Sequence, residues 1–203
     1  MQEHPPPLSF RTFALMPITY EHSPRPVGGP IHFSLEGDRL TVDSGRKVRE
    51  VRLGAVDLVR MTFEPGRFAQ KAYRTKVVMK DGKTFTFTSL TWRSLVEARE
   101  QGPEYRAFSE ALLGAILRAN PDARFAAGKP LGLWLITSAI GIASLIVMAL
   151  LIWRAFQTGA ANIALMGALF ALVGIWQIEP MVRLNKPRPF DPKAPPAELL
   201  PRS

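Results

Sequence analysis

The chain has 203 residues, of which 26 are lysine or arginine and 17 are aspartate or glutamate, so its formal net charge is +9. It has no cysteine, which excludes a disulfide framework, a cysteine-ligated metal site and a thiol nucleophile. The hydrophobic content of 47% is typical of a soluble protein, but apolar residues crowd into residues 131–178 and charged residues fill most of residues 36–124. The composition therefore predicts two parts with different surroundings.

The first thirty residues are rich in proline and lack the basic-then-apolar pattern of a secretory signal, so we expect an uncleaved N-terminus. Proline supplies no amide donor and resists regular elements. We therefore predict that residues 1–30, and likewise the proline-rich residues 186–203, are extended and poorly packed.

Alternation of apolar and polar residues begins at Ile31 and predicts an antiparallel meander. Residues 31–36 alternate, Gly37-Asp38 supplies a turn, and Leu40 and Val42 continue the pattern. Less regular runs extend it over residues 47–53 and 57–63. Together with the hairpin that follows, about six strands are expected.

A hairpin is predicted over residues 73–89, because the pair Asp81-Gly82 is a strong signal for a two-residue turn. Side chains at alternate positions then lie on opposite faces of the sheet. The apolar face would carry Tyr73, Thr75, Val77 and Met79 with Phe85 and Phe87 opposite, and the cationic face would carry Arg74, Lys76 and Lys80 with Thr84, Thr86 and Thr88.

Two helix starts follow the strands. Ser94 and Glu97 have the spacing of a capping box, and Pro103 after Gly102 suits a first helical turn. The second helix would place one apolar stripe on the sheet and stop at Asn120-Pro121. The stripe consists of Tyr105, Phe108, Leu112, Ala115 and Ala119.

Two uncharged segments, residues 131–153 and 160–178, are the expected transmembrane helices. At about 1.5 Å per residue, helices of this length cross a hydrocarbon core of about 30 Å. Residues 154–159 form a short polar turn, and Glu179 with Pro180 ends the second span. The alternative, a buried helical hairpin of a soluble protein, would need more covering residues than the chain offers.

Basic residues lie before the first span and after the second, whereas the turn between them holds only Arg154. Because basic loops are retained on the cytoplasmic side, both termini should be cytoplasmic. We expect an integral membrane protein. No ionisable group lies within either apolar core, which argues against a transporter.

Small residues in the second span recur at helical spacing and form one seam, and one face of the first span also carries small side chains. The two sets are Ala160, Ala164, Gly167, Ala171 and Gly174, and Thr137, Gly141 and Ser144. We interpret the seam as packing of the hairpin against itself. The alternative occupant is a second copy of the chain or another membrane protein.

Antiparallel strands followed by one amphipathic helix resemble the pleckstrin-homology (PH) superfold, and the chain is similar to bacterial PH-like membrane proteins, which combine such a domain with transmembrane helices. The resemblance rests on residues 31–53, 73–89, 89–92, 105–108 and 185–192. It implies an α+β fold: an antiparallel PH-like β-barrel or sandwich with a C-terminal amphipathic helix, followed by a two-helix transmembrane hairpin. It also implies a binding or scaffolding role, and a location in the cytoplasmic (inner) membrane of a bacterium.

The resulting division of the chain has five parts. They are a proline-rich N-terminal segment (1–30), the PH-like domain (31–120), a linker (121–130), the transmembrane hairpin (131–179) and a basic, proline-rich cytoplasmic tail (180–203).

Residues with catalytic potential are sparse. The glycines form no phosphate-binding loop, and His4 and His22 lie in the proline-rich stretch while His32 lies in a predicted strand, half-exposed. Three carboxylates are interpreted as a solvated helix face because of their helical spacing: Glu97, Glu100 and Glu104. We therefore expect no enzymatic activity, no cofactor and no metal site.

The connection at residues 64–74 places basic side chains around one aromatic ring and is the candidate binding site. A cationic loop with an exposed ring can hold a phosphate while the ring enters the headgroup layer. The candidates for binding an anionic lipid or partner are Arg67, Phe68, Lys71, Arg74, Lys76 and Lys80. Alternatively, Phe68 covers the apolar face of the sheet and the charges only keep the domain soluble.

The sequence thus predicts a membrane-anchored, non-enzymatic binding or scaffolding module whose cationic cytoplasmic domain contacts anionic lipid headgroups or an acidic partner. The alternative is an accessory structural subunit of a larger membrane complex, docked through the seam of the second span. Nucleic acid is not an expected partner, because the basic strands lack interleaved exposed aromatic residues for base stacking.

Overall fold

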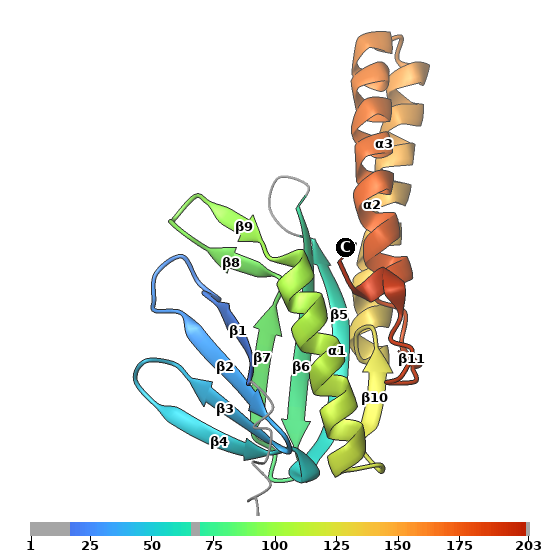
Figure 1. The fold of residues 1–203 in the computed structure, drawn as a ribbon. Helices are drawn as coiled ribbons and strands as arrows, with labels where there is room; N and C mark the ends of the chain where they lie inside the picture. Colours follow the sequence, from blue (N-terminus) through green and yellow to red (C-terminus); the bar gives the residue numbers. More distant parts are fainter. Residues whose placement is uncertain (1–16, 66–69, 202–203) are drawn as a thin grey trace, which may run out of the picture.

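The structure is a computed structural model that describes residues 17–65 and 70–201. A mixed α and β domain is followed by two long helices (Figure 1). The strands are β1 (Ile18–His22), β2 (Ile31–Glu36), β3 (Arg39–Asp43), β4 (Val48–Arg52), β5 (Val56–Pro65), β6 (Lys71–Met79), β7 (Thr84–Thr88), β8 (Leu90–Trp92), β9 (Ala98–Glu100), β10 (Arg124–Ala127) and β11 (Arg188–Pro189). The helices are α1 (Gly102–Ala119), α2 (Leu131–Gln157) and α3 (Ala161–Leu184), with short 3-10 turns at Leu53–Ala55 and Ala197–Leu199.

The strands form three sheets, none of which closes into a barrel within the described residues. The first sheet has the order β1-β2-β3-β4 and the second the order β11-β10-β5-β6-β7, while β8 and β9 form a separate hairpin. All pairs are antiparallel except β10 with β5. The prediction of an α+β fold with antiparallel sheets and two long apolar helices at its C-terminal end is confirmed.

The hydrophobic core lies between the two larger sheets and α1. The rings of Phe33 in β2 and Phe87 in β7 lie 5.7 Å apart between centroids, and Phe108 of α1 lies 5.2 Å from Phe87. Each such pair contributes about 0.5–1.5 kcal/mol beyond its burial. The Tyr105 hydroxyl is buried and shares a hydrogen bond of 2.6 Å with Thr75. The predicted apolar stripe of α1 therefore joins the helix to both sheets.

The predicted hairpin is confirmed as β6 and β7, but its turn is longer than the expected two residues: the Met79 N–H donates to the Lys83 carbonyl oxygen at 2.8 Å, so residues 80–82 form the turn. Thr75 pairs with Phe87, and Val77 pairs with Phe85. Gly82 has a φ of +79°, in the left-handed region that favours glycine. As expected from the alternation, the inward side chains of β6 are buried and the basic ones are exposed.

The helix predicted from Ser94 is wrong, because residues 93–97 form the turn between β8 and β9. The Ser94 hydroxyl oxygen accepts hydrogen bonds from the N–H groups of Val96 (3.4 Å) and Glu97 (3.1 Å). A serine makes the same bonds in a turn as at a helix start, so the spacing alone does not distinguish them. The three carboxylates assigned to one helix face lie instead in this turn, in β9 and in α1: Glu97, Glu100 and Glu104.

The prediction that the proline-rich N-terminal stretch is poorly packed is wrong for its described part. β1 pairs with β2 over its five residues, and its inward side chains Tyr20 and His22 are buried. Pro17 and Pro24 flank this strand and do not interrupt it, which is where sheets tolerate proline. His22 is therefore a core residue.

The C-terminal tail is also packed on the domain, contrary to the prediction for residues 186–203. β11 pairs with β10, and the ring of Phe190 lies 5.9 Å from that of Phe125. Leu199 and Leu200 are buried in the core. The tail contributes apolar side chains that proline content alone does not reveal, so both ends of the described chain belong to the core of the β domain.

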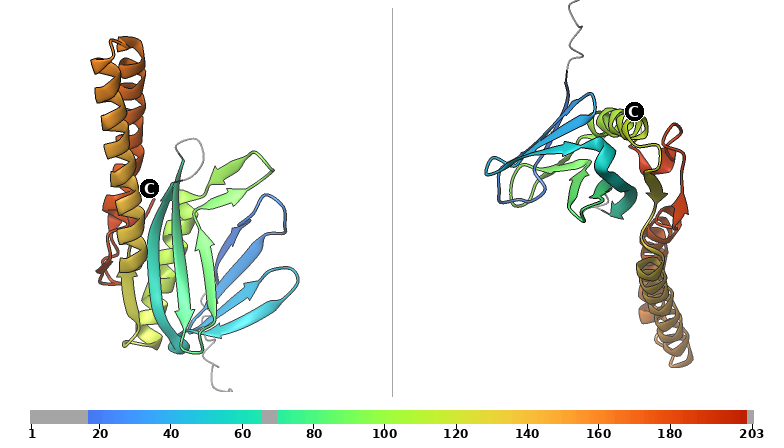
Figure 2. Two further views of the ribbon diagram at one scale, coloured as in Figure 1. Left: turned by 180° about the vertical axis from the view of Figure 1, so that it is seen from behind. Right: turned by 90° about the horizontal axis from the view of Figure 1, so that it is seen from below.

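Helices α2 and α3 form an antiparallel hairpin that runs on past the β domain (Figure 2). Both are long and apolar enough to cross a membrane, with mean hydropathies of 2.6 and 1.8. Only 6% of the apolar window of each is buried, whereas a core helix of a soluble protein is largely covered. The structure therefore gives no support to a buried soluble hairpin.

Both long helices extend beyond their predicted ends. α2 continues past Arg154, whose positive charge is favourable in the last turn of a helix. α3 continues through Pro180 to Leu184, because a proline near the end of a helix removes only one amide donor. Each helix therefore has a polar final turn beyond its uncharged segment.

Candidate functional site

Asn185, the residue after α3, joins the helical hairpin to the β domain. Its side-chain NH2 group donates to the Phe63 carbonyl oxygen at 2.8 Å, and its side-chain oxygen accepts from the Phe63 N–H at 3.1 Å. The residue is 0% exposed. The pairing of β10 with β5 ends at Met61, so the Asn185 amide occupies the position that a further β10 residue would hold. Two buried hydrogen bonds thus fix the end of α3 on β5.

Gly128 allows the chain to approach this point closely. Its φ is +78°, and a Cβ at this position would lie 2.4 Å from the Asn185 carbonyl oxygen and 2.5 Å from that of Lys186. Both obstacles are backbone atoms, so only glycine fits without movement of the main chain. The Lys129 N–H donates to the Asn185 carbonyl oxygen at 3.0 Å. The entry to α2 and the exit from α3 are therefore held together at β5.

The predicted seam of α3 lies against α2. A Cβ at Gly167 would lie 2.9 Å from Ile152 Cγ1, and a Cβ at Gly174 would lie 3.7 Å from Leu145 Cδ2. Small residues here allow close packing of the two helices. Ala164 is buried, and the other positions of the seam are half-buried: Ala160, Gly167, Ala171 and Gly174.

On α2, Gly141 faces α3, because a Cβ there would lie 3.0 Å from Ile178 Cγ2. Thr137 is half-buried, and its hydroxyl donates to the Trp134 carbonyl oxygen at 3.1 Å. Ser144 needs correction: it is exposed and donates to the Gly141 carbonyl oxygen of its own helix at 2.7 Å. Positions 138, 141 and 145 follow helical spacing on the facing side, which turns position 144 away.

The structure does not gather the predicted cationic residues into one patch. Arg67 and Phe68 lie outside the described residues. Lys71 begins β6 and Lys80 follows its end, so they are separated by about 30 Å at about 3.3 Å per residue. Between them, Lys76 is exposed, and Arg74 forms an ion pair of 2.8 Å with Glu64 of β5.

One end of the second sheet points along the helical hairpin. β10 is parallel to β5 and leads into α2, so β5 and α2 run in the same direction (Figure 1). From Asn185 to Ile178 α3 rises about 10 Å, and from Phe63 to Pro65 β5 rises about 7 Å. Pro65 pairs with Lys71. This end of the sheet therefore lies near the level at which the uncharged part of α3 begins.

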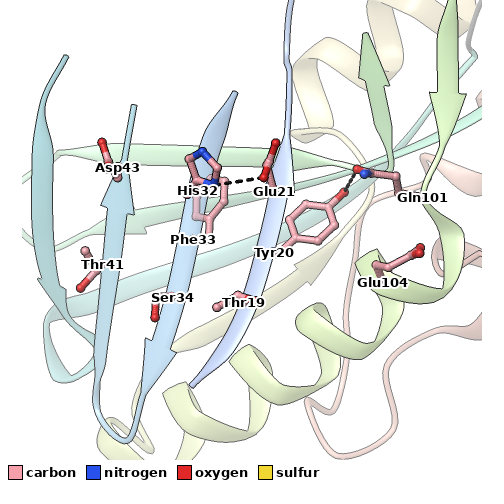
Figure 3. A pocket seen from close by; sticks show the side chains of 10 residues that line it. All are labelled: Thr19, Tyr20, Glu21, His32, Phe33, Ser34, Thr41, Asp43, Gln101 and Glu104. Atoms are coloured by element: carbon pink, nitrogen blue, oxygen red, sulfur yellow. Dashed lines mark hydrogen bonds and ion pairs between the residues drawn. The ribbon is translucent and has the colours of Figure 1, made fainter. Parts of the chain in front are cut away.

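A shallow hollow of about 700 Å³ lies beside the first three strands and the start of α1 (Figure 3). The Glu21 carboxylate pairs with His32 Nδ1 at 3.1 Å, and both side chains are more than half exposed. The Tyr20 hydroxyl donates to the Thr88 carbonyl oxygen at 2.6 Å, and burial raises the pKa of Tyr20. The exposed contact between Glu21 and His32 contributes about 0–1 kcal/mol. No group of three metal-ligating side chains occurs in the part of the chain that the structure describes.

A second cavity, of about 680 Å³, lies between β4 and β7, which are edge strands of the two larger sheets. Its lining combines apolar side chains with an excess of cationic ones. The apolar members include Val51, Met79 and Phe85, the cationic members are Lys47, Arg49, Arg52 and Lys83, and the acidic members are Glu50 and Asp81. Sequence analysis missed this cavity, because two strands far apart in the chain form it. The density of basic residues near β4 is its only signal.

No family model, curated protein or solved structure matches the chain. The function must therefore be inferred from three features of the described residues: the exposed apolar hairpin, its attachment at Asn185, and the cationic surface of the domain.

Proposed function

We propose that the chain is a membrane-anchored, non-enzymatic binding module of a bacterial inner membrane. In this proposal α2 and α3 cross the bilayer, and the β domain, PH-like in plan, lies on the cytoplasmic leaflet. The observation that carries the proposal is the exposed apolar surface of a hairpin that is attached to the domain at Asn185. Two helices with apolar side chains on their outer faces need lipid around them.

The distribution of basic residues supports a cytoplasmic domain. Lys129, Arg183 and Lys186 flank the helix ends at the domain, whereas Arg154 is the basic residue near the far turn. Because basic flanks are retained on the cytoplasmic side, this distribution supports a cytoplasmic position of the domain and both termini. Only a short turn joins α2 and α3, so in this topology the far side of the membrane carries a turn and no second folded domain between the two helices.

The PH-like plan is supported by the order of the elements. The meander β1–β4 and the antiparallel strands β5, β6 and β7 precede one amphipathic helix, α1, and all three share one core. The hairpin β8–β9 and the strands β10 and β11 are additions to that plan. Of these additions, β10 leads into α2 and β11 follows α3, so these two strands link the domain to the long helices.

Lys71 and Arg74 are the residues through which the domain would contact anionic headgroups. They lie at the end of β6 that reaches the level of the uncharged helix surface. Each basic group near an anionic surface adds about 1 kcal/mol. The ion pair with Glu64 reduces what Arg74 contributes, so Lys71 is the stronger of the two.

The topology can be tested directly, because the cysteine-free chain accepts single labels. In one variant Thr158→Cys marks the turn between the helices, and in another Asp38→Cys marks the exposed turn between β2 and β3. A membrane-impermeant maleimide applied to intact cells stripped of their outer membrane should label the first variant, and should label the second only after lysis. Recovery of the full chain in the supernatant of a detergent-free ultracentrifugation would refute the proposal.

The headgroup contact should be tested on the whole chain, because the core includes Tyr20 and Leu199 and a fragment of residues 31–120 would lack both. In bilayer nanodiscs, deuterium uptake around Lys71 should be slower with phosphatidylglycerol than with phosphatidylcholine alone, and added salt should remove the difference. The Asp81-Gly82 turn at the other end of β6 serves as the control, with no expected difference. Equal uptake around Lys71 in both bilayers would reject lipid binding.

An acidic partner protein is the second candidate ligand, favoured by the cavity between β4 and β7. An extended acidic segment could pair with an edge strand there while its carboxylates contact the four cationic side chains. A third role, docking of an accessory subunit through the seam of α3, is less favoured, because α2 occupies that seam. Loss of partner capture in Arg49→Glu, with capture intact in Lys71→Glu, would distinguish the cavity from the lipid-facing end.

A further inference from the structure

The turn between β8 and β9 exposes two aliphatic side chains. Leu95 is 67% exposed and Val96 is 84% exposed. Ser94 closes the turn by accepting the backbone N–H groups of Val96 and Glu97, so both aliphatic side chains are held at its tip. Because burial of apolar surface is favourable by about 25 cal/mol per Å², an apolar environment would stabilise this aliphatic pair.

The β8–β9 hairpin is held in a defined position on the domain. The Gln70 side chain donates to the Ala98 carbonyl oxygen at 3.0 Å, and the Trp92 N–H donates to the Ser23 carbonyl oxygen at 3.0 Å. A two-stranded hairpin is marginally stable alone, and these bonds to neighbouring segments supply the support. The tip is therefore presented by the domain and is not a free loop.

The β8–β9 hairpin lies at the end of the β domain past which the helical hairpin extends, and it runs outward from the domain to its turn (Figure 1). Ala98 lies beside Gln70, next to the Lys71 end of β6, and the turn extends about 7 Å beyond Ala98 at the rise of a strand. That end of β6 lies near the level at which the uncharged surface of α3 begins, at Ile178. Leu95 and Val96 therefore reach the level of the headgroup layer around a membrane-spanning hairpin.

The charges beside the tip suit a bilayer surface. Arg93 and Arg99 flank the turn and are exposed, and Glu97 and Glu100 balance their charge, so two arginines stand beside the tip without a net negative charge. Arginine can lay its aliphatic stem along apolar surface while its guanidinium group stays among headgroups. A soluble protein partner would not explain why the aliphatic tip lies near the level at which the uncharged surface of α3 begins.

We propose that the β8–β9 turn is a second, non-helical membrane contact, in which Leu95 and Val96 enter the interface of the leaflet on the domain side. This inference rests on the proposed membrane anchoring and adds that the domain itself dips into the bilayer at a fixed point. The hairpin and the turn together hold the domain in one orientation relative to the membrane.

The test uses the full chain reconstituted in vesicles of phosphatidylcholine with phosphatidylglycerol. A polarity-sensitive dye (NBD) is attached to Val96→Cys, with Leu95→Cys as a second tip variant. Asp38→Cys, in the exposed turn between β2 and β3, reports water, and Leu150→Cys, on the exposed face of α2, reports hydrocarbon. Nitroxide groups on the lipid chains near the headgroups act as quenchers.

Dye at either tip position should emit at shorter wavelength than dye at Asp38 and should be quenched by the shallow nitroxide. If both tip labels behave like the Asp38 label while the Leu150 label lies in hydrocarbon, the turn does not enter lipid and a protein partner becomes its occupant, but the membrane anchoring stands. If the Leu150 label also reports water, the anchoring and this inference fail together. Near-native circular dichroism of each labelled variant confirms that the comparison is made on folded protein.

Discussion

Replacing Asn185 by alanine tests whether the helical hairpin is fixed to the β domain. The change removes both partners of the Phe63 backbone, whose N–H and C=O groups bind the Asn185 amide at 3.1 and 2.8 Å. Each buried polar group left without a partner costs about 1–3 kcal/mol. Allowing for partial relaxation, we expect the local opening of this junction to become easier by about 2–4 kcal/mol.

The assay is hydrogen exchange of the full chain in nanodiscs, followed by mass spectrometry of the peptide that contains Phe63. A loss of 2–4 kcal/mol corresponds to exchange that is roughly 30- to 700-fold faster, since about 1.4 kcal/mol is a factor of ten. The matched control is Asn162→Ala, which removes an exposed asparagine from the first turn of the same helix and should leave this peptide unchanged. Unchanged exchange at Phe63 in folded Asn185→Ala would refute the role of the side chain as a clamp.

Three further changes test the packing. Gly128→Ala should lower the melting temperature of the purified chain strongly, because its Cβ meets the Asn185 backbone at 2.4 Å in a conformation with a φ of +78°. Gly167→Leu should destabilise the helical hairpin in detergent by about 1–3 kcal/mol, since it pushes Ile152 away; a variant as stable as the native chain would contradict the packing. Burial lowers the pKa of His22 from its ordinary 6.5 to about 4. As the pH falls, this side chain therefore takes up its proton at a higher pH in the unfolded chain than in the folded chain. Stability should be complete above pH 6.5 and fall by up to about 3 kcal/mol as the pH drops to 4; denaturant titrations of His22→Phe should lose this dependence.

Elements with a strong local pattern could be predicted from the sequence. The β6–β7 hairpin follows from Asp81-Gly82 between two alternating runs, and α1 follows from apolar residues at helical spacing with Pro103 at its start. The long helices follow from composition alone. In each of these the signal lies within about twenty residues, the length over which periodicity can be recognised.

Elements that depend on distant partners could not be predicted. β11 contains Pro189 and pairs with β10, which precedes both long helices in the chain. β1 was missed for a different reason: Pro17 and Pro24 flank it, although its partner β2 follows closely in the chain. Ser94 has the same hydrogen-bonding capacity in a turn as at a helix start, and only the surrounding fold decides between them. The role of Asn185 depends on Phe63, which is 122 residues away in the chain.

For the candidate site, the sequence predicted which side chains of β6 face outward but not how far apart they lie. Alternation correctly placed the basic side chains of β6 outward, but the spacing of a strand separates Lys71 from Lys80 by about 30 Å. The cavity between β4 and β7 and the aliphatic tip of β8–β9 required the three-dimensional structure, because the first joins two edges and the second depends on a turn predicted as helix.

In the proposed arrangement the junction at Asn185 and the tip at Val96 both fix the domain relative to the membrane, so the two should depend on each other. If the two hydrogen bonds to Phe63 set the height of the domain along α3, weakening them lets the domain move while the helices stay in lipid. Asn185→Ala should then shift the emission of an NBD label at Val96→Cys toward that of a water-exposed label, with the Leu150→Cys label unchanged. A Val96 label that stays equally deep would mean that the aliphatic turn binds the bilayer by itself, without help from the clamp.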